Sequence, residues 1–394
     1  MTNLAYELAQ PGPNGLAPGR KAGFIAPLTL VTIAVIAIAL WGAMSVLIGI
    51  GKDILNINEE IRLEVASLTM ESRLLYFIHT EPVDHLGVRI NGRRQTPADI
   101  FGLSDSNADT SQTNVRIGLQ NTLSSIGDPI PQPLVFDERL YRAEVPAIGE
   151  VELSFQDGGG LFNLKLLDRA EIHRLLTAFG VDEELANRLS ASAVDYVDSD
   201  DLQEPNGAER DDYRRVKARG PINRAILAPE EIFGALGWSD AFTPARRRLL
   251  LRYLTVSSQT NIRNVNTAPA IVLSTWFPIN VEQARGFMQE RNTERALSAG
   301  DVNRLTGALA GPNEFEINGI SSLEVRMTIA LKGRHNSDLR REVWLVRAAN
   351  AQDRPFFRRG ARFLKGDAEH EKGDGISPQK NAEEFPGIED AFSR

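Results

Sequence analysis

The chain has 394 residues, of which 42% are apolar and 24% are charged, an ordinary balance for a globular protein with a core to bury. It contains no cysteine, which excludes disulfides, thiolate catalysis, thiolate zinc sites and iron–sulfur clusters. A net charge of −8 argues against a protein that coats nucleic acid, and the five histidines show no metal-ligand spacing, which argues against a zinc hydrolase.

The first predicted element is a hydrophobic segment, Phe24–Ile50, that contains no charged residue. It is long enough to cross a bilayer and longer than the roughly 7–15 apolar residues of a cleaved secretory signal. Arg20 and Lys21 precede it, whereas Lys52 and Asp53 follow it and nearly cancel. This charge bias predicts a retained single-pass anchor, with the N-terminus in the cytoplasm and the bulk of the chain outside.

An apolar stripe with interleaved charged residues continues the helix beyond the membrane. Pro82 predicts its end, because proline lacks a backbone N–H and disfavours helix at the residue before it. We therefore expect one helix of about fifty residues, half in lipid and half packed against a domain outside. The stripe comprises Ile50, Ile54, Ile57, Ile61, Val65, Leu68 and Leu75.

A polar leader, a basic pair, Gly23-Phe24 and a long helix together resemble the type IV prepilin family. The resemblance implies that a prepilin peptidase cuts after Gly23 and that the new N-terminal Phe24 is methylated. Family members normally carry glutamate at the fifth mature position, where this chain has Leu28. Leu28 therefore either argues against membership of the family or restricts the resemblance to one subfamily.

The stretch from Asp84 to Ile130 is rich in small polar residues and has poor periodicity, which predicts an irregular excursion. Strands are predicted at Glu150–Phe155 and Phe162–Leu166, joined as a hairpin by Gly158-Gly159-Gly160. A phosphate-binding loop is the weaker interpretation of these glycines, because a strand follows them where such a loop needs a helix.

From Asp168 to about Gly307 the periodicity is helical, and strands return at Leu323–Leu331 and Arg340–Ala348. The charged tail from Asn350 onward is predicted to be disordered. This order predicts an α+β fold, in which a helical domain is inserted into a small antiparallel pilin-type sheet that carries the long N-terminal helix. The expected divisions are leader 1–23, transmembrane helix 24–50, outer half of the helix 51–82, first part of the sheet with its insertion 83–167, helical domain 168–316, closing strands 317–349 and tail 350–394.

Two stretches in the helical block carry a sharper resemblance, AVDYVDSDDLQEPNGAERDDY at Ala193–Tyr213 and TNIRNVNTAPAIVL at Thr260–Leu273. Together with LFNL at 161–164 and Leu28, they are similar to the minor pseudopilin K family of type II secretion systems. The resemblance covers residues 23 to 348. The chain departs from the family at Tyr196, where tryptophan is usual.

The resemblance implies a structural component rather than an enzyme, in a machine that exports folded proteins from the periplasm across the outer membrane. Family members act at the tip of a periplasmic pseudopilus, with the I and J minor pseudopilins and the major pseudopilin as partners. The implied location is the bacterial inner membrane, with the main domain in the periplasm. Leu28 suits the first subunit of the filament, which has no subunit above it whose free amine a glutamate would neutralise.

An acidic run in the helical block predicts a calcium site. Asp198, Asp200 and Glu209 fall at positions 1, 3 and 12 of a twelve-residue count, as ligands do in an EF-hand loop. Leu202 and Gln203 occupy the fifth and sixth positions, so the match is partial, and we expect a looser oxygen cage that a backbone carbonyl completes. Family resemblance also implies calcium, whereas a merely solvated acidic loop is the alternative. The candidate ligands are Asp198, Asp200, Asp201, Glu209 and Asp212.

Two other classes of function remain as alternatives. The segment 264–268, NVNTA, followed by a helix resembles a helix-hairpin-helix DNA-binding unit, but its joint, Phe277–Asn280, lacks the glycine that faces phosphate. The missing glycine and the net negative charge of the chain both argue against a nucleic-acid partner. A membrane-anchored periplasmic hydrolase would use the carboxylates between Asp195 and Asp212, but no accompanying Ser/His/Asp or paired-histidine pattern is found.

Overall fold

The computed structural model describes residues 25–90, 133–257, 263–291, 296–308, 321–322, 324–332, 339–347, 356–365 and 383–384. The chain divides into two compact units, residues 1–61 and residues 62–394, which are described separately. Helix α1 (Ile25–Thr80) begins in the first unit and ends in the second, before Pro82 as predicted. Its apolar part is long and hydrophobic enough to cross a membrane, and Leu28 lies there, 58% exposed.

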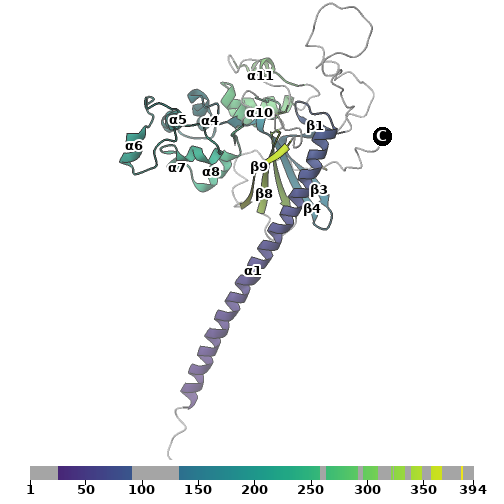
Figure 1. The fold of residues 1–394 in the computed structure, drawn as a ribbon, viewed down its shortest axis with the longest axis vertical. Helices are drawn as coiled ribbons and strands as arrows, with labels where there is room; N and C mark the ends of the chain where they lie inside the picture. Colours follow the sequence, from purple (N-terminus) through teal and green to yellow (C-terminus); the bar gives the residue numbers. More distant parts are fainter. Residues whose placement is uncertain are drawn as a thin grey trace, which may run out of the picture. The chain divides into compact units, whose positions relative to one another are not determined.

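The second unit is built on a six-stranded sheet with strand order β10-β3-β4-β7-β8-β9 (Figure 1). Neighbouring strands pair antiparallel, except that the short β10 runs parallel to β3. The predicted strands 150–155, 323–331 and 340–348 correspond to β4, β7 and β8, whereas β3 was not predicted. The strands are β3 Asp137–Val145, β4 Gly149–Asp157, β7 Glu324–Leu331, β8 Leu339–Arg347, β9 Phe356–Lys365 and β10 Glu383–Glu384.

A second, two-stranded sheet joins the start of the stretch that was predicted to be irregular, Asp84–Ile130, to residues just after its end. Strand β1 (Gly87–Arg89) pairs antiparallel with β2 (Pro133–Val135). Gly87 has φ +153°, and a Cβ there would lie 2.2 Å from the carbonyl oxygen of Leu134, so only glycine allows this close approach. Residues 91–130 of the predicted excursion lie outside the described residues.

From Arg62 onward, α1 packs against one face of the six-stranded sheet. The helix buries Leu63, Ala66, Met70, Leu74 and Phe77, which recur at three- and four-residue spacing. The sheet contributes alternate residues of its strands, as expected for one buried face. They include Val151, Leu153 and Phe155 of β4, Val325, Met327 and Ile329 of β7, and Val343 and Leu345 of β8.

The predicted packing stripe of the outer half of the long helix is only partly confirmed, since Leu75 packs against the sheet core but Val65 and Leu68 do not. Val65 and Leu68 each remain 45% exposed, although both belong to that stripe. The helix carries two apolar faces in this region, and periodicity alone does not tell which of them meets the sheet.

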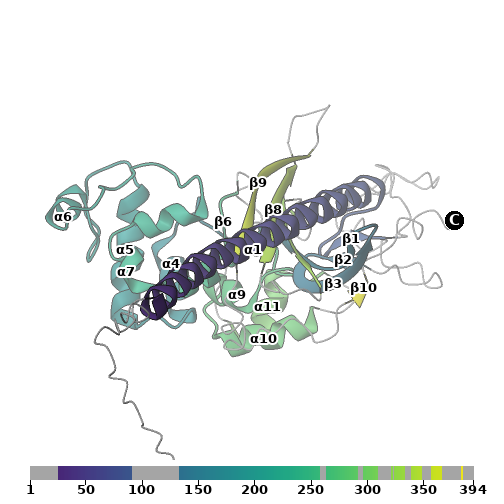
Figure 2. The same ribbon diagram turned by 90° about the horizontal axis from the view of Figure 1, so that it is seen from below.

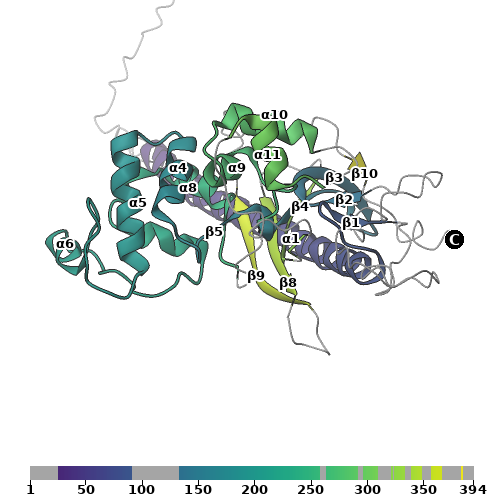
Figure 3. The same cartoon turned by 90° about the horizontal axis from the view of Figure 1, so that it is seen from above.

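The helical elements form a second layer beside the sheet (Figure 3). The predicted helical segments are confirmed, and Asp168, Asp182, Thr243, Asn280 and Ser298 cap helix N-termini through their side chains. Trp238 is buried in the core of this domain. The elements are α4 Arg169–Ala178, α5 Glu183–Val197, α6 Arg210–Arg215, η2 Pro229–Gly234, α7 Trp238–Ala241, α8 Pro244–Leu251, α9 Ala270–Trp276, α10 Val281–Glu290 and α11 Ala299–Thr306.

The three consecutive glycines do not form the predicted hairpin. Gly158–Gly160 form a buried 3₁₀ turn, η1, and the chain then leaves the main sheet. Strand β5 (Phe162–Asn163) pairs in parallel with β6 (Leu254–Thr255) of the helical domain. The prediction failed because β4 pairs with β3, which was not predicted, and with β7, which is remote in sequence. Nothing in the local sequence showed that the chain passes from the sheet to the helical domain here instead of turning back in a hairpin.

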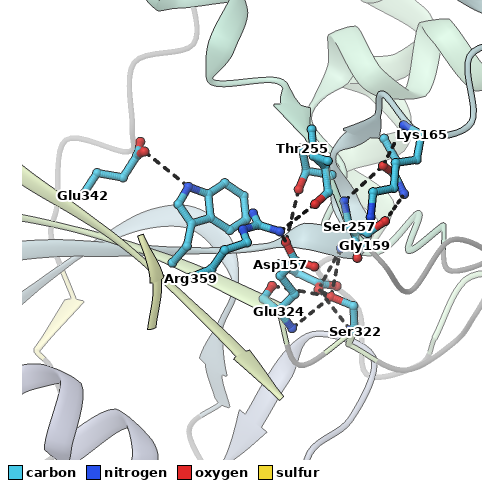
Figure 4. A network of polar contacts seen from close by, with 12 residues as sticks. Asp157, Gly159, Lys165, Thr255, Ser257, Ser322, Glu324, Glu342 and Arg359 are labelled. Atoms are coloured by element: carbon cyan, nitrogen blue, oxygen red, sulfur yellow. Dashed lines mark hydrogen bonds and ion pairs between the residues drawn. The ribbon is translucent and has the colours of Figure 1, made fainter. Parts of the chain in front are cut away.

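Asp157 joins the sheet to the helical domain at this crossing (Figure 4). Its fully buried carboxylate accepts hydrogen bonds from the backbone N–H of Gly159 and of Ser322, both at 3.0 Å. From the helical domain, Asn264 Nδ2 donates to it at 2.9 Å and Thr267 Oγ1 at 3.1 Å. Buried polar groups require such partners, so this network fixes the start of the insertion.

The prediction of a disordered tail was wrong for residues 356–365. These residues form β9, the strand next to β8 at one margin of the sheet (Figure 2). The arginines of β9 pair with three acidic residues that are 5% exposed or less, Glu71, Glu324 and Glu342. The predicted α+β fold, with a long helix on an antiparallel sheet and a helical insertion, is confirmed.

Candidate calcium site

Three acidic side chains converge between the end of α5 and the start of α6. Asp195 lies in the last turn of α5, Asp198 follows its final residue, and Glu209 directly precedes α6. Each offers a carboxylate oxygen, and these oxygens all lie within 4.8 Å of one another. Asp195 is fully buried and Glu209 is 8% exposed, so the cluster is largely removed from water.

The oxygens of this cluster lack hydrogen-bond partners among the described residues. They are Oδ2 of Asp195, Oδ1 of Asp198 and both Oε atoms of Glu209. An unpaired buried carboxylate is costly, and three together are more so. Calcium binds oxygen ligands at about 2.3–2.6 Å, so ligands on opposite sides of the ion are up to about 5 Å apart. The cluster therefore fits a hard divalent cation, with backbone carbonyls and water as further ligands.

The pKa values of the three carboxyl groups are all raised. Burial is the main cause for each, and the charges of the neighbouring acids raise the pKa of Asp198 and Glu209 further. For Asp195, burial is partly offset by the backbone N–H of Glu204, which donates to Oδ1 at 3.1 Å. A cation would relieve both effects.

The loop between α5 and α6 is shaped closely around Asp195. A Cβ at position 207 would lie 2.0 Å from Asp195 Oδ2, so Gly207 is needed for the backbone to pass the carboxylate. Arg169 holds the loop from α4, donating to Glu204 Oε2 at 2.8 Å and to the carbonyl oxygen of Pro205 at 2.9 Å. The site is thus fixed by contacts that do not involve an ion.

The other predicted ligands do not join the cluster. Asp200 and Asp201 are exposed, and Asp200 Oδ1 accepts from the N–H of Leu202 at 2.8 Å. Asp212 accepts from the backbone N–H of Glu209 at 3.1 Å and pairs with Arg215 at 2.7 Å. The EF-hand-like spacing correctly selected Asp198 and Glu209 because these two residues stand at the two ends of the loop.

Sequence reasoning missed Asp195 as a ligand. Its signal was its position three residues before Asp198, which places both side chains on one face at the end of the helix that enters the acidic loop. Of the other predicted site residues, Leu28 lies on α1, whereas Gly23 and Phe24 lie outside the described residues.

The segment that resembled a DNA-binding unit is part of the core. Asn264, Asn266 and Thr267 are fully buried, and the amide of Asn266 bonds to the backbone of Leu297. Every residue of α9 is buried as well, so neither the segment nor its helix offers a surface to phosphate.

The stability of the chain should depend on pH in opposite ways with and without calcium. A carboxyl group whose pKa is raised in the fold stabilises it below its unfolded value, and this contribution is lost as the pH rises through the folded value. In chelator we therefore expect the melting temperature to fall as the pH rises above about 4, where these carboxyl groups begin to ionise in the unfolded chain. With calcium the melting temperature should rise over the same pH range, because protons compete with the ion for the carboxylates. Thermal melts at a series of pH values, with calcium and with chelator, check both expectations.

The comparisons with known proteins concern the same region. Residues 160–259 match the family model described as "Type II secretion system (T2SS), protein K". Residues 160–259 are therefore similar to the protein K domain of type II secretion systems. The domain contains Asp195, Asp198 and Glu209, and the family resemblance predicted from the sequence is confirmed.

A curated relative of this protein K domain supports the assignment. The type II secretion system protein K of Pseudomonas aeruginosa is 27% identical over 165 residues, which cover 40% of this chain. The chain matches about half, 49%, of that relative's length. A solved structure, the GspK-GspI-GspJ complex of enterotoxigenic Escherichia coli, aligns with 16% identity and a TM-score of 0.43 over 60% of this chain and 86% of that one.

Proposed function

We propose that this protein is the minor pseudopilin at the tip of a type II secretion pseudopilus, and that it serves the export of folded proteins from the periplasm across the outer membrane. The protein K domain at residues 160–259 carries the proposal. The apolar start of α1 supports a single-pass anchor in the inner membrane, with the main domain in the periplasm. On this proposal the protein is a structural component and not an enzyme.

The partners are the I and J minor pseudopilins and the major pseudopilin. Assembly through the long helix is supported by its second apolar face, where Val65 and Leu68 are exposed beside the face that packs on the sheet. Contiguous exposed apolar side chains favour a protein contact. The inserted helical domain suits a terminal subunit, since nothing need stack above it.

Calcium is the proposed ligand of Asp195, Asp198 and Glu209. The ion would close the loop between α5 and α6, which no disulfide holds because the chain lacks cysteine. Metal binding to a folded site adds directly to the free energy of unfolding. The site is therefore a stabilising element of the helical domain.

Assembly tests the proposed function. The full chain with a C-terminal tag, expressed in its host and extracted in detergent, should co-purify with the I, J and major pseudopilins. Deleting its gene should leave secreted proteins in the periplasm, and the intact chain should restore export. A deletion strain that secretes normally would reject the function, whatever the chain binds.

Cleavage by the prepilin peptidase should remove residues 1–23. Gly23 follows the basic pair, and the apolar helix after it places the bond at the cytoplasmic face. N-terminal sequencing of the protein from its host should begin at a methylated Phe24 and continue Ile-Ala-Pro. An intact leader, or another N-terminus, contradicts this. A Gly23→Leu variant serves as the control and should keep the leader.

Replacing Leu28 by glutamate should alter the position of the subunit in the filament. In pilins this glutamate is thought to neutralise the amine of a neighbour inside the membrane, and an unpaired acid there costs several kcal/mol. We expect Leu28→Glu to reduce membrane insertion or to let another subunit sit above it, whereas Leu28→Met should behave as the parent. Site-specific crosslinking in the native filament distinguishes these outcomes, and normal secretion with tip-only crosslinks would refute the role of Leu28.

A further inference from the structure

Four residues of the sheet contact one segment of the helical domain, residues 252–256, and a fifth, Trp344, stacks against two of the four. We call them the clamp: Glu138, Glu324, Arg326, Trp344 and Arg359. They come from β3, β7, β8 and β9, so four strands of the sheet contribute to this contact. The grasped segment contains β6, the strand that pairs with β5 inside the helical domain.

Two guanidinium groups lie against the Trp344 ring, and each of them reaches into the helical domain. Arg326 lies 5.5 Å from the ring centroid and donates to the carbonyl oxygen of Arg252 at 2.8 Å. Arg359 lies 4.6 Å from the centroid and donates to the carbonyl oxygen of Val256 at 2.7 Å. Arginine suits this double role, because its planar group stacks on a ring while its N–H groups bind oxygens.

Each guanidinium also pairs with a largely buried carboxylate. Arg326 pairs with Glu138, which in turn meets Arg252 of the helical domain at 3.2 Å. Arg359 pairs with Glu324, which is fully buried and accepts from Thr255 Oγ1 at 3.3 Å (Figure 4). A buried carboxylate that loses its cation is strongly unfavourable, so these pairs hold only while the two layers stay together.

Two clamp residues, Glu138 and Arg359, lie at departures from regular strand geometry. Glu138 lies at an irregularity of β3 and has φ +66°, a strained value for a residue other than glycine. Arg359 lies in a bulge of β9, where Gly360 pairs with Trp344 but Arg358 pairs with Leu345. Successive side chains of a strand point to opposite faces. Arg358 therefore faces α1, where it pairs with Glu71, while Arg359 faces the helical domain.

We propose that the clamp is an interdomain joint that holds the helical domain in one orientation on the sheet, and that Arg359 of β9 is its positioning residue. Strand β9 therefore does more than extend the sheet. Its Arg359 is the shared partner of the Glu324 carboxylate and the Val256 carbonyl oxygen, and both lose that partner if the arginine is removed. The inference goes beyond the proposed function and requires no bound ion.

Hydrogen exchange on the full chain in detergent micelles tests the joint. In Arg359→Ala we expect peptides that cover residues 252–257 and 161–166 to exchange about tenfold faster, because the clamped segment opens locally. Arg358→Ala is the matched control: the neighbouring residue on the same strand, also paired with a buried acid, should speed exchange around Glu71 and leave residues 252–257 unchanged. Arg359→Lys keeps the charge with fewer donors and should give an intermediate rate.

A distance measurement covers the case in which Arg359→Ala folds poorly. Because the chain has no cysteine, Glu144→Cys on β3 and Arg188→Cys on α5 place a spin-label pair at two exposed positions, one in each layer. The parent and Arg358→Ala should give one narrow distance distribution, and Arg359→Lys a broadened one. An unchanged distribution, or exchange that is equally fast in the two alanine variants, would overturn the proposal. Neither readout depends on calcium or on secretion, so both remain informative if the proposed function fails.

Discussion

Replacing Asp195 by asparagine should abolish stabilisation by calcium. In the parent chain, calcium at a hundredfold excess over its dissociation constant should add about 2.7 kcal/mol to the free energy of unfolding. Asp195 is fully buried, and its Oδ2 faces the cluster without a hydrogen-bond partner, so its loss removes a charged ligand from the centre of the site. We expect the calcium-dependent shift of the melting temperature to disappear in Asp195→Asn and to shrink strongly in Glu209→Gln.

The same substitution should have the opposite effect in chelator. Without an ion, the cluster holds three carboxylates whose pKa values are raised by burial and, for Asp198 and Glu209, also by mutual repulsion. Asparagine removes one of these charges and keeps the acceptor that binds the N–H of Glu204. Asp195→Asn should therefore melt at or above the parent when calcium is absent, and below it when calcium is present.

Asp200→Asn is the matched control for this experiment. Asp200 was predicted from the sequence as a ligand, but its carboxylate is exposed and caps the N–H of Leu202. It should retain the full calcium shift, measured by thermal melts of the whole chain in detergent and by the heat of calcium binding. A parent chain that neither binds calcium nor gains stability would reject the site, and a loss in Asp200→Asn equal to that in Asp195→Asn would reject the assignment of ligands.

The parts of the fold that are encoded locally could be predicted from the sequence. The apolar run and the stop at Pro82 specify α1, and helical periodicity with capping residues such as Asp182 and Asn280 specifies the helical domain. The β7–β8 hairpin also follows from its own residues. These elements depend on neighbours in the chain, which a single sequence displays.

Partner choice between remote segments could not be predicted. The face of α1 that meets the sheet, and the crossing of β5 to β6, depend on tertiary packing rather than on local pattern. Strand β9 was predicted to be part of a disordered tail because that stretch is charged and has little to bury, whereas the buried partners of its arginines, Glu71 and Glu324, lie far away in the sequence. A charged segment can therefore be ordered when its side chains pair with buried groups of opposite charge elsewhere in the fold.

The calcium site shows the same division. The EF-hand-like count identified Asp198 and Glu209, which bracket the loop, but it placed Asp200 in the site as well. Local hydrogen bonding decides against Asp200, whose carboxylate closes a turn. Asp195 belongs to a helix rather than to the loop, so a count restricted to the loop could not include it.

Replacing Asp157 by alanine should cause the largest loss of stability predicted for this chain. Asp157 accepts from the backbone N–H groups of Gly159 and Ser322 and from the Ser322 hydroxyl on one side, and from the side chains of Asn264 and Thr267 on the other. Asp157, Asn264 and Thr267 are fully buried, so alanine removes a charged acceptor that these donors share in the core. Two of the donors keep a second acceptor, since the N–H of Gly159 also donates to Ser322 Oγ at 3.0 Å and Asn264 Nδ2 to the carbonyl oxygen of His85 at 2.8 Å. Each lost hydrogen bond to a charged group costs about 1.5–3 kcal/mol, and the sum over the donors is about 4 kcal/mol or more.

Urea unfolding of the full chain in detergent, with chelator present, measures this loss apart from calcium. Asp168→Ala is the control: Asp168 also accepts from a backbone N–H, that of Glu171 at 2.9 Å, but at an exposed helix cap whose removal costs about 1 kcal/mol. The loss of stability in Asp157→Asn should lie between these two values. The amide oxygen still accepts from the N–H groups of Gly159 and Ser322, but the amide nitrogen faces Asn264 Nδ2, which is also a donor. A loss in Asp157→Ala no larger than that in Asp168→Ala would mean that the network at the crossing does not hold the sheet and the helical domain together.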